Sequence, residues 1–235
     1  MSRSTTAEPL PVTTHPPGTV ARRRRRTAGV LLAVGGLALA ASQVVQPRGG
    51  DEVFAVSLAG SRERWVAWGV LVMVSALLQL PAVVLLRASV TTGRGARLTG
   101  AGGALTALSL VALFGFGLTH ADLATLVGPA PVRPDVLAAF QRLDESVSLG
   151  VTTVLALAGF HLGWPLLLAG LARARRFPPA LAVVGAASVF LSLFGAVLGA
   201  GGEVALFVLA GLCLAASGVV LVRDPAAADQ LAGRP

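Results

Sequence analysis

The sequence predicts an all-α membrane protein, a polytopic bundle of six transmembrane helices. Six apolar stretches, each 19 to 26 residues long, contain no Asp, Glu, Lys or Arg. A helix rising about 1.5 Å per residue needs about 20 apolar residues to cross a hydrocarbon core roughly 30 Å thick. These stretches are too long for the strands of a membrane barrel, which need about 9–11 residues. The predicted spans are residues 27–46, 65–86, 98–118, 147–172, 179–200 and 204–222.

Composition agrees with a membrane location. Hydrophobic residues make up 54% of the 235-residue chain and charged residues only 13%, whereas soluble domains carry about 25% charged residues. The net charge of +8 comes from Arg alone, because the chain has no Lys. Together with the abundance of Ala, Gly, Val and Leu, this favours a bacterial source with G+C-rich codons. The basic residues flank the spans rather than form a nucleic-acid surface, so we expect no nucleic-acid partner.

The placement of the Arg residues predicts the orientation. Cytoplasmic loops are enriched in Lys and Arg, because basic residues resist translocation. Most of the acids occupy the alternate loops, so both termini should be cytoplasmic, in the bacterial inner membrane. Anionic lipid near the first cluster would add about 1 kcal/mol per Arg. The clusters on the predicted cytoplasmic side are Arg22–Arg26; Arg87, Arg94 and Arg97; Arg173, Arg175 and Arg176; and Arg223.

The two ends of the chain are predicted to be tails that flank one transmembrane domain, residues 27–223. Residues 1–26 are Pro-rich with no apolar periodicity, which predicts a disordered basic cytoplasmic tail. Residues 224–235 form a second, short cytoplasmic tail. Span one also resembles a cleavable signal peptide, with Ala38-Leu39-Ala40 before Ala41. Because its apolar run continues to Gln46, we expect an uncleaved helix, with cleavage as the alternative.

The longest outer loop, residues 119–146, has two interpretations. Pro134-Asp135 is typical of a helix start, and apolar residues follow at helical spacing. One interpretation is a short interfacial helix over 135–145 that bends into span four. The other is a single tilted helix running from 135 to 172.

Two polar side chains in the spans are the candidate intramembrane site. Gln79 lies two residues before Pro81 in span two, and His161 lies four residues before Pro165 in span four. Polar groups inside a membrane are costly and so mark functional positions by default. Either the two side chains line one cavity at kinked helices, or each hydrogen-bonds across a helix interface. No acid or base lies deep in any span, which argues against proton-coupled carriers and ion pumps.

A second, weaker candidate is a cluster on the outer face: His120, Asp122, Glu145 and Glu203. Imidazole and carboxylate groups suit a divalent cation, but their spacing matches no ligand motif, so we expect no metal. Haem needs two imidazoles at similar depth, whereas His120 and His161 differ by about half a membrane at 1.5 Å per residue. Cys213 is the single cysteine, and no nucleophile or phosphate-loop motif occurs. We therefore expect neither a cofactor nor an enzyme.

Small residues recur at four-residue spacing in the last two spans. Gly195 and Gly199 form one such pair, and Gly211 and Ala215 form another, while Ser188 and Ser192 extend the first stripe. Pairs of this kind allow two helices to approach closely. The Gly195/Gly199 face is thus a candidate contact with a second copy or another membrane protein, beside the lipid bilayer itself.

Several short segments resemble a group of uncharacterised six-span bacterial inner-membrane proteins, a domain-of-unknown-function class. The similarity covers most of residues 27–223 and has no specific motif. It implies six helices and a membrane location, and it supplies no activity and no site residues. The matching segments are the basic tail with span one, Phe54, Arg64-Trp65, Gly93-Arg94-Gly95-Ala96-Arg97-Leu98, and Leu168 to Pro178 at the end of span four.

The sequence thus favours a non-enzymatic integral membrane protein with a structural, accessory or sensory role. The alternative is a small transporter or permease with a cavity near Gln79 and His161.

Overall fold

The protein is seen in a computed structural model that describes residues 17–47, 61–127, 133–144, 146–194 and 199–223. Within these residues it contains seven α-helices and no strand. The helices are α1 (Pro17–Val45), α3 (Arg62–Ala88), α4 (Ala96–Leu126), α5 (Pro134–Asp144), α6 (Val147–Arg173), α7 (Pro179–Ser192) and α8 (Gly199–Arg223). The predicted all-α class is confirmed.

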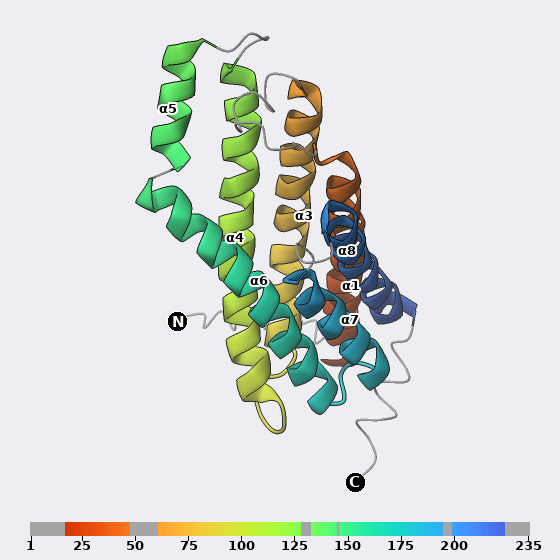
Figure 1. Cartoon of the computed structure of the whole chain (residues 1–235). Coiled ribbons are helices and arrows are strands. Elements are labelled where there is room, and N and C mark those ends of the chain that lie inside the picture. Colours follow the sequence, from red (N-terminus) through yellow and green to blue (C-terminus); the bar gives the residue numbers. More distant parts are fainter. Residues whose placement is uncertain (1–16, 48–60, 128–132, 145, 195–198, 224–235) are drawn as a thin grey trace, which may run out of the picture.

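Six of these helices form a closed ring in chain order (Figure 1). Each of α1, α3, α4, α6, α7 and α8 packs against its neighbours in the sequence, and α8 packs back against α1. The short helix α5 stands apart at the far end and contacts mainly the start of α6. One core of buried residues joins the helices of the ring, with Trp164, Leu32 and Leu214 fully buried in it.

Five helices are long and apolar enough to cross a bilayer, namely α1, α3, α4, α6 and α8. The sixth predicted span, 179–200, is represented by α7, which is apolar but only 14 residues long. Such a helix rises about 21 Å, less than the roughly 30 Å of a hydrocarbon core. Residues 195–198, in the rest of this predicted span, lie outside the described residues.

The first helix begins earlier than the sequence predicted. We expected a disordered tail up to residue 26, but α1 starts at Pro17 and includes the whole run Arg22–Arg26. Proline is well tolerated in the first turn of a helix, and Arg is a strong helix former. The helix nucleated by span one therefore continues through the basic segment, and residues 17–26 are not a disordered tail.

The structure also separates α5 from α6. Ser146 has an extended backbone, and its hydroxyl accepts a hydrogen bond from Leu149 N at 3.3 Å, which caps the start of α6. A Ser cap of this type satisfies one of the free N–H groups at a helix start. The single helix over 135–172 is therefore wrong, and the separate short helix is confirmed; its position relative to a membrane interface stays a prediction.

Glycines allow the backbones of neighbouring helices to touch. A Cβ atom on Gly36 of α1 would lie 2.6 Å from the carbonyl oxygen of Gly211 in α8, and one on Gly211 would lie 2.8 Å from that of Gly36. On α4, a Cβ atom on Gly102 would overlap the backbone of Leu167 in α6. Small residues that admit such close approach are typical of helix interfaces in membranes. We call these two interfaces, α1–α8 and α4–α6, the glycine seams.

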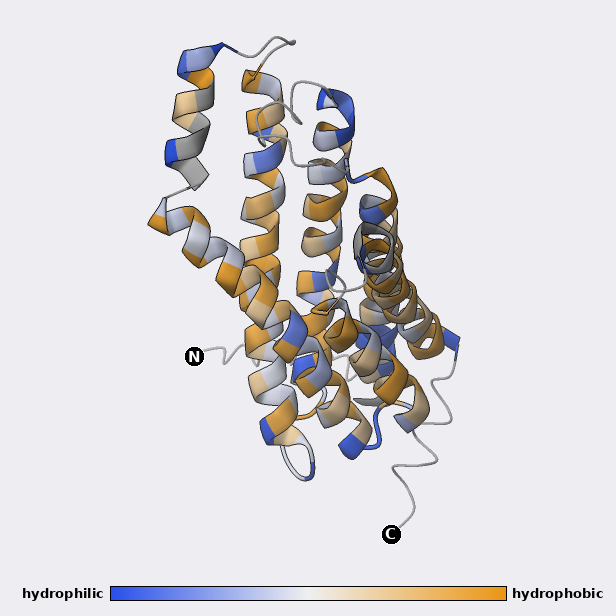
Figure 2. Cartoon of the chain, in the orientation of Figure 1, coloured by the Kyte–Doolittle hydropathy of each residue, from blue (hydrophilic) through white to orange (hydrophobic). Residues whose placement is uncertain are grey.

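Large apolar side chains also cover the outside of the ring. Leu77, Val111 and Leu162 are 61%, 58% and 52% exposed, each in the middle of a long helix. Figure 2 shows hydrophobic residues along the helix shafts and hydrophilic ones mainly towards their ends. A soluble bundle would hide such residues, whereas a lipid-facing one need not. The chain is therefore a helical, membrane-embedded protein.

Candidate functional site

His161 lies at the interface of α6 and α7 and is almost completely buried, with 2% of its surface exposed. Its Nδ1 lies 2.7 Å from the carbonyl oxygen of Leu157, one turn earlier in α6. Its Nε2 lies 3.1 Å from Oγ of Ser192 in α7. Phe160 and Phe207 pack edge-on against the ring, with centroids 5.5 and 5.9 Å away. Both ring nitrogens therefore lie within hydrogen-bond distance of an oxygen atom of the protein.

The bond to Ser192 marks the end of α7. A carbonyl oxygen accepts only from a protonated nitrogen, so Nδ1 carries the hydrogen and Nε2 of the neutral ring accepts. The Ser192 hydroxyl has a second acceptor, the Val189 carbonyl oxygen at 2.7 Å, and can serve one of the two at a time. Ser192 is the last residue of α7. His161 therefore contacts this short helix at its last residue.

Gln79 lies at the interface of α1 and α3 and is fully buried. Its Nε2 donates to Ser75 Oγ at 2.7 Å, and Ser75 Oγ donates to the carbonyl oxygen of Gly35 in α1 at 2.9 Å. A Cβ atom on Gly35 would lie 2.7 Å from Gln79 Cγ. The Gln79 Oε1 atom is buried and accepts no hydrogen bond from the described part of the chain.

The two predicted intramembrane residues thus belong to different interfaces. Gln79 is linked to α1 through Ser75 of its own helix, whereas His161 contacts Ser192 of α7, and α4 or α8 separates these interfaces around the ring. Sequence reasoning left open whether the pair lines one cavity or bonds across helix interfaces. The contact of His161 with Ser192 is of the second kind, whereas Gln79 itself donates within α3, to Ser75. A cavity shared by the two residues stays a prediction. The partners Ser75, Gly35 and Ser192 had no sequence signal that paired them with Gln79 or His161.

His120, from the predicted outer-face cluster, lies in an aromatic cluster. Its ring stacks on Trp65 at 5.7 Å, meets Trp68 edge-on at 5.1 Å and lies 4.1 Å from Phe116. Its Nδ1 is 2.8 Å from the Phe116 carbonyl oxygen. These contacts join α3 to α4 near the end of the bundle opposite the Arg clusters. Tryptophan at this level is typical of the interfacial belt.

Two acidic members of that cluster, Asp122 and Glu203, lie within the described residues. Asp122 and Glu203 are exposed on α4 and α8. Among the residues that the structure describes, no three His, Cys, Asp or Glu side chains come together as a metal site. Glu145 lies outside the described residues, so the complete four-residue cluster stays a prediction.

The small-residue stripes are used inside the chain. Gly211 and Ala215 face α1, where each contacts Gly36. Ser188 and Ser192 are each 3% exposed and face inwards. Gly195 lies outside the described residues, so the predicted contact through the Gly195/Gly199 face stays a prediction.

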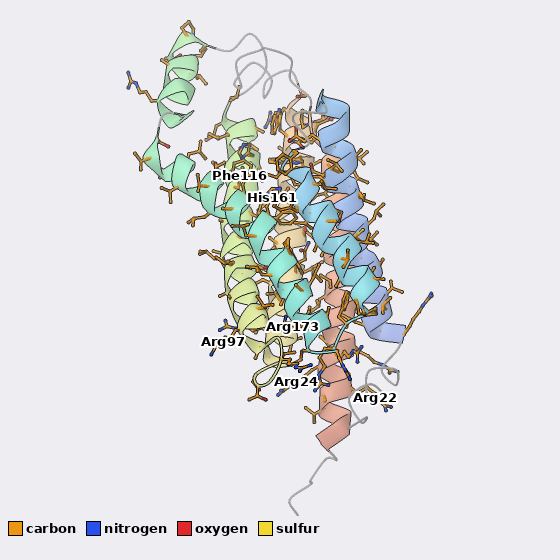
Figure 3. All side chains as sticks on the ribbon, turned by 60° about the horizontal axis from the view of Figure 1, so that its bottom comes forward. Arg22, Arg24, Arg97, Phe116, His161 and Arg173 are labelled. Atoms are coloured by element: carbon orange, nitrogen blue, oxygen red, sulfur yellow. The ribbon has the colours of Figure 1, made fainter. Side chains whose placement is uncertain are left out.

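Sequence reasoning missed a cavity at the end of the bundle where α1 begins, which we call the basic end. Arg22, Arg24, Arg25 and Arg176 line this cavity of about 320 Å³ together with core residues of α3, α6 and α8. Figure 3 shows Arg22, Arg24, Arg97 and Arg173 gathered at this end, with His161 and Phe116 farther along the bundle. The Arg clusters were visible in the sequence as a topology signal, but not as a shared site.

Comparison with known proteins gave no relative. No protein-family model, curated protein or solved structure matches the chain.

Proposed function

We propose that this chain is a non-enzymatic integral membrane protein with a structural, accessory or sensory role. We place it in the bacterial inner membrane, with six spans and both termini cytoplasmic. Its segment resemblance to uncharacterised six-span inner-membrane proteins supports the same assignment. The observation that carries the proposal is the use of the buried polar groups of His161, Ser192 and Ser75 in hydrogen bonds that hold helices together.

A structural first span supports this proposal. Helix α1 contributes one half of a glycine seam and the Gly35 carbonyl that Ser75 bonds. Arg64 of α3 also donates to the carbonyl oxygens of Val45 and Gln46, at 3.2 and 3.5 Å, where α1 ends. An Arg at the end of a helix satisfies its last carbonyl groups and its dipole. Removal of α1 as a signal peptide would break all three contacts, so we infer that it is retained.

The orientation is tested by two fusions after Pro235. We expect the fusion with a fluorescent protein that folds only in the cytoplasm to be bright. We expect the fusion with an alkaline phosphatase that folds only outside to be inactive. The reverse result would contradict the proposed topology, since either the direction or the even number of spans would then be wrong.

A second candidate function, a small transporter for neutral solutes, is favoured by two observations. The first is the buried Gln79 Oε1, which accepts no hydrogen bond from the described residues. Leaving an acceptor buried in this state costs about 1–3 kcal/mol, and the hydroxyl or amide N–H of a bound solute would satisfy it. The second is α7, which ends beside His161; interrupted helices at mid-membrane commonly mark the binding sites of transporters.

The variant Gln79→Leu separates the two functions. Leucine keeps the approximate volume and removes the unsatisfied oxygen, while Ser75 still reaches the Gly35 carbonyl. If Gln79 has only a packing role, the thermal stability of the Gln79→Leu variant equals or exceeds that of the wild type. Proteoliposomes with the wild-type protein then shrink in glycerol or urea gradients at the same rate as protein-free vesicles. Shrinkage that is faster with the wild-type protein, and slowed by Gln79→Leu and His161→Ala, would establish the transporter instead.

A further inference from the structure

The cavity at the basic end combines cationic and apolar walls. Three of its Arg residues come from one segment of α1, while Arg176 comes from the loop between α6 and α7. The apolar wall consists of core residues from three helices, Leu86, Leu171 and Leu221, each at most 5% exposed. A ligand that fills this cavity would therefore meet guanidinium groups on one side and hydrocarbon on the other.

A polar groove adjoins the cavity. It has a volume of about 510 Å³ and shares Ser89 and Arg176 with the cavity. Its walls add the hydroxyl groups of the loop between α3 and α4, and three further Arg residues: Arg94, Arg173 and Arg175. The two spaces thus bring Arg residues from three segments of the chain to one region, with the hydroxyl groups of Thr91 and Thr92 beside them.

The loop that carries Arg176 is built with local strain. Arg175 has φ of 55°, the left-handed conformation that favours glycine. The N–H of Arg176 donates to Leu171 O and that of Arg175 to Ala172 O, both at 2.9 Å, which is the Schellman pattern for ending a helix. The next residue, Phe177, is buried in the core. Arg175 thus occupies the position of this turn where glycine is usually found, and the buried Phe177 anchors the turn to the core. Unusual backbone geometry of this kind clusters at ligand sites.

The positive charge at this end, with Arg22, Arg24 and Arg176 on the cavity wall, suits an anionic ligand. The carboxylate side chains that the structure describes, on Glu63, Asp122, Asp135 and Glu203, all lie towards the opposite end of the bundle. Guanidinium groups held close together repel one another, and an anion bound between them relieves this repulsion. The planar guanidinium group matches phosphate oxygens with paired hydrogen bonds.

We propose that this cavity binds the headgroup of an anionic phospholipid that carries two phosphates. The Arg residues bind phosphate oxygens, and the apolar wall covers the glycerol and the first acyl carbons. Basic pockets between transmembrane helices at a membrane surface bind headgroups of this chemistry. A soluble phosphate would leave the apolar wall uncovered, which favours the lipid. The inference needs the proposed membrane location but neither the orientation nor the accessory role.

Native mass spectrometry of the full-length protein in mild detergent tests this proposal. The probes are cardiolipin, which carries two phosphates, zwitterionic phosphatidylcholine, and inorganic pyrophosphate as the soluble anion. We expect cardiolipin to bind at least about tenfold more tightly than the other two, since charge-assisted hydrogen bonds and apolar burial both act on it alone. Pyrophosphate binding as tight as cardiolipin would overturn the lipid as the ligand.

Matched variants locate the site. Arg176→Gln removes the residue shared by the cavity and the groove, and should weaken cardiolipin about tenfold. Arg97→Gln removes the same charge from the same end, but Arg97 lines neither space, so its effect should stay below about twofold. Equal losses in the two variants would show surface attraction only and overturn the proposal.

A third variant tests whether weaker cardiolipin binding could result from loss of folding. Arg175→Gly relieves the left-handed backbone, so it should raise the melting temperature while it weakens cardiolipin binding. A variant that is more stable and binds cardiolipin as tightly as the wild type would contradict the role of this turn in the site.

Discussion

The glycine seams and the interface of α7 hold the bundle in different ways. At the seams, Gly36 against Gly211 and Gly102 against Leu167 bring backbone against backbone. On α7, the Cβ position of Gly185 meets only the flexible end of Leu168, and Ser188 and Ser192 are buried instead. The close contacts at the seams give a large total stabilisation, because the energies of many weak dispersion contacts add up. The α7 interface combines side-chain packing, with Ala182 and Val189 buried in the core, and one hydrogen-bond contact with a defined partner.

This contrast shows what the intramembrane polar residues do. Helices with glycine on their facing sides are positioned by shape, because only one register brings the small residues together. Helix α7 is short and half exposed, and Val183, Val184 and Leu191 are 67%, 52% and 49% exposed. We expect its position to depend in part on the contact between His161 and Ser192. Breaking either type of interface tests the comparison.

The largest effect is expected at a glycine seam. A methyl group on Gly102 would overlap the backbone of α6, which cannot move aside as a flexible side chain can. Gly102→Ala should therefore lower the free energy of unfolding by about 2–3 kcal/mol. The matched control is Gly100→Ala on the same helix, where a Cβ atom meets nothing within 4 Å; it should raise stability by about 0.5–1 kcal/mol. Unfolding titrations in mixed micelles measure both, and similar effects would remove the basis for the seam.

An intermediate effect is expected at His161. His161→Ala should cost about 1–2 kcal/mol, since it removes a membrane hydrogen bond and a ring packed on two Phe side chains. Ser192→Ala removes only the hydrogen bond. A double-mutant cycle of the two should give a coupling energy of about 0.6–1.7 kcal/mol. Additive effects would mean that the contact does not position α7.

A smaller effect, of opposite sign, is expected in the turn before α7. Arg175→Gly should stabilise the fold by about 1 kcal/mol, because glycine adopts the left-handed conformation without the clash of a side chain. Thermal unfolding in detergent measures it, and Arg173→Gly, inside the last turn of α6, is the control. There glycine should destabilise by about 0.8–1 kcal/mol. A loss of stability in both variants would contradict the positive φ at Arg175.

The smallest effect is expected on exposed α5. Arg133 donates to both oxygens of Asp135, at 3.0 and 2.7 Å, and this hydrogen bond lowers the pKa of Asp135 below its usual value of 3.8. Because the folded pKa is lowered, any stabilisation is present above the unfolded pKa and is lost as the pH falls through the folded one. Both groups are solvated, so Arg133→Ala should raise this pKa, as read by NMR titration, with no measurable change in melting temperature at pH 7. A clear fall in melting temperature would show that the ion pair of Arg133 with Asp135 contributes to the stability of the whole fold, which contradicts the peripheral position of α5.

The apolar runs predicted most of the fold from the sequence. Hydropathy reports length and solvent preference, so it located five of the six spans as long helices. It could not show that α7 ends at Ser192, because residues 179–200 are apolar throughout. It also could not show that α1 begins at Pro17, because the helical propensity of the Arg run was hidden beside a Pro-rich tail.

The candidate site was predictable only in part. Gln79 and His161 are conspicuous as polar residues in apolar spans, but their partners lie on other helices, with Ser192 31 residues beyond His161. Gly100 and Gly102 look alike in the sequence, and only the packing of α6 distinguishes them. The Arg cavity required Arg22 and Arg176 to meet at one end of the ring, which no local pattern reports.

Cysteine labelling tests most directly whether the intramembrane polar residues hold helices together rather than line a water-filled path. With Cys213→Ser, the only native thiol is removed, and single cysteines replace Gln79, His161 or, as the exposed control, Arg97. We expect a membrane-impermeant thiol reagent to label position 97 and to leave positions 79 and 161 unmodified in intact vesicles from either side. Labelling at 79 or 161 in a folded variant would contradict the packing role and favour a solute pathway.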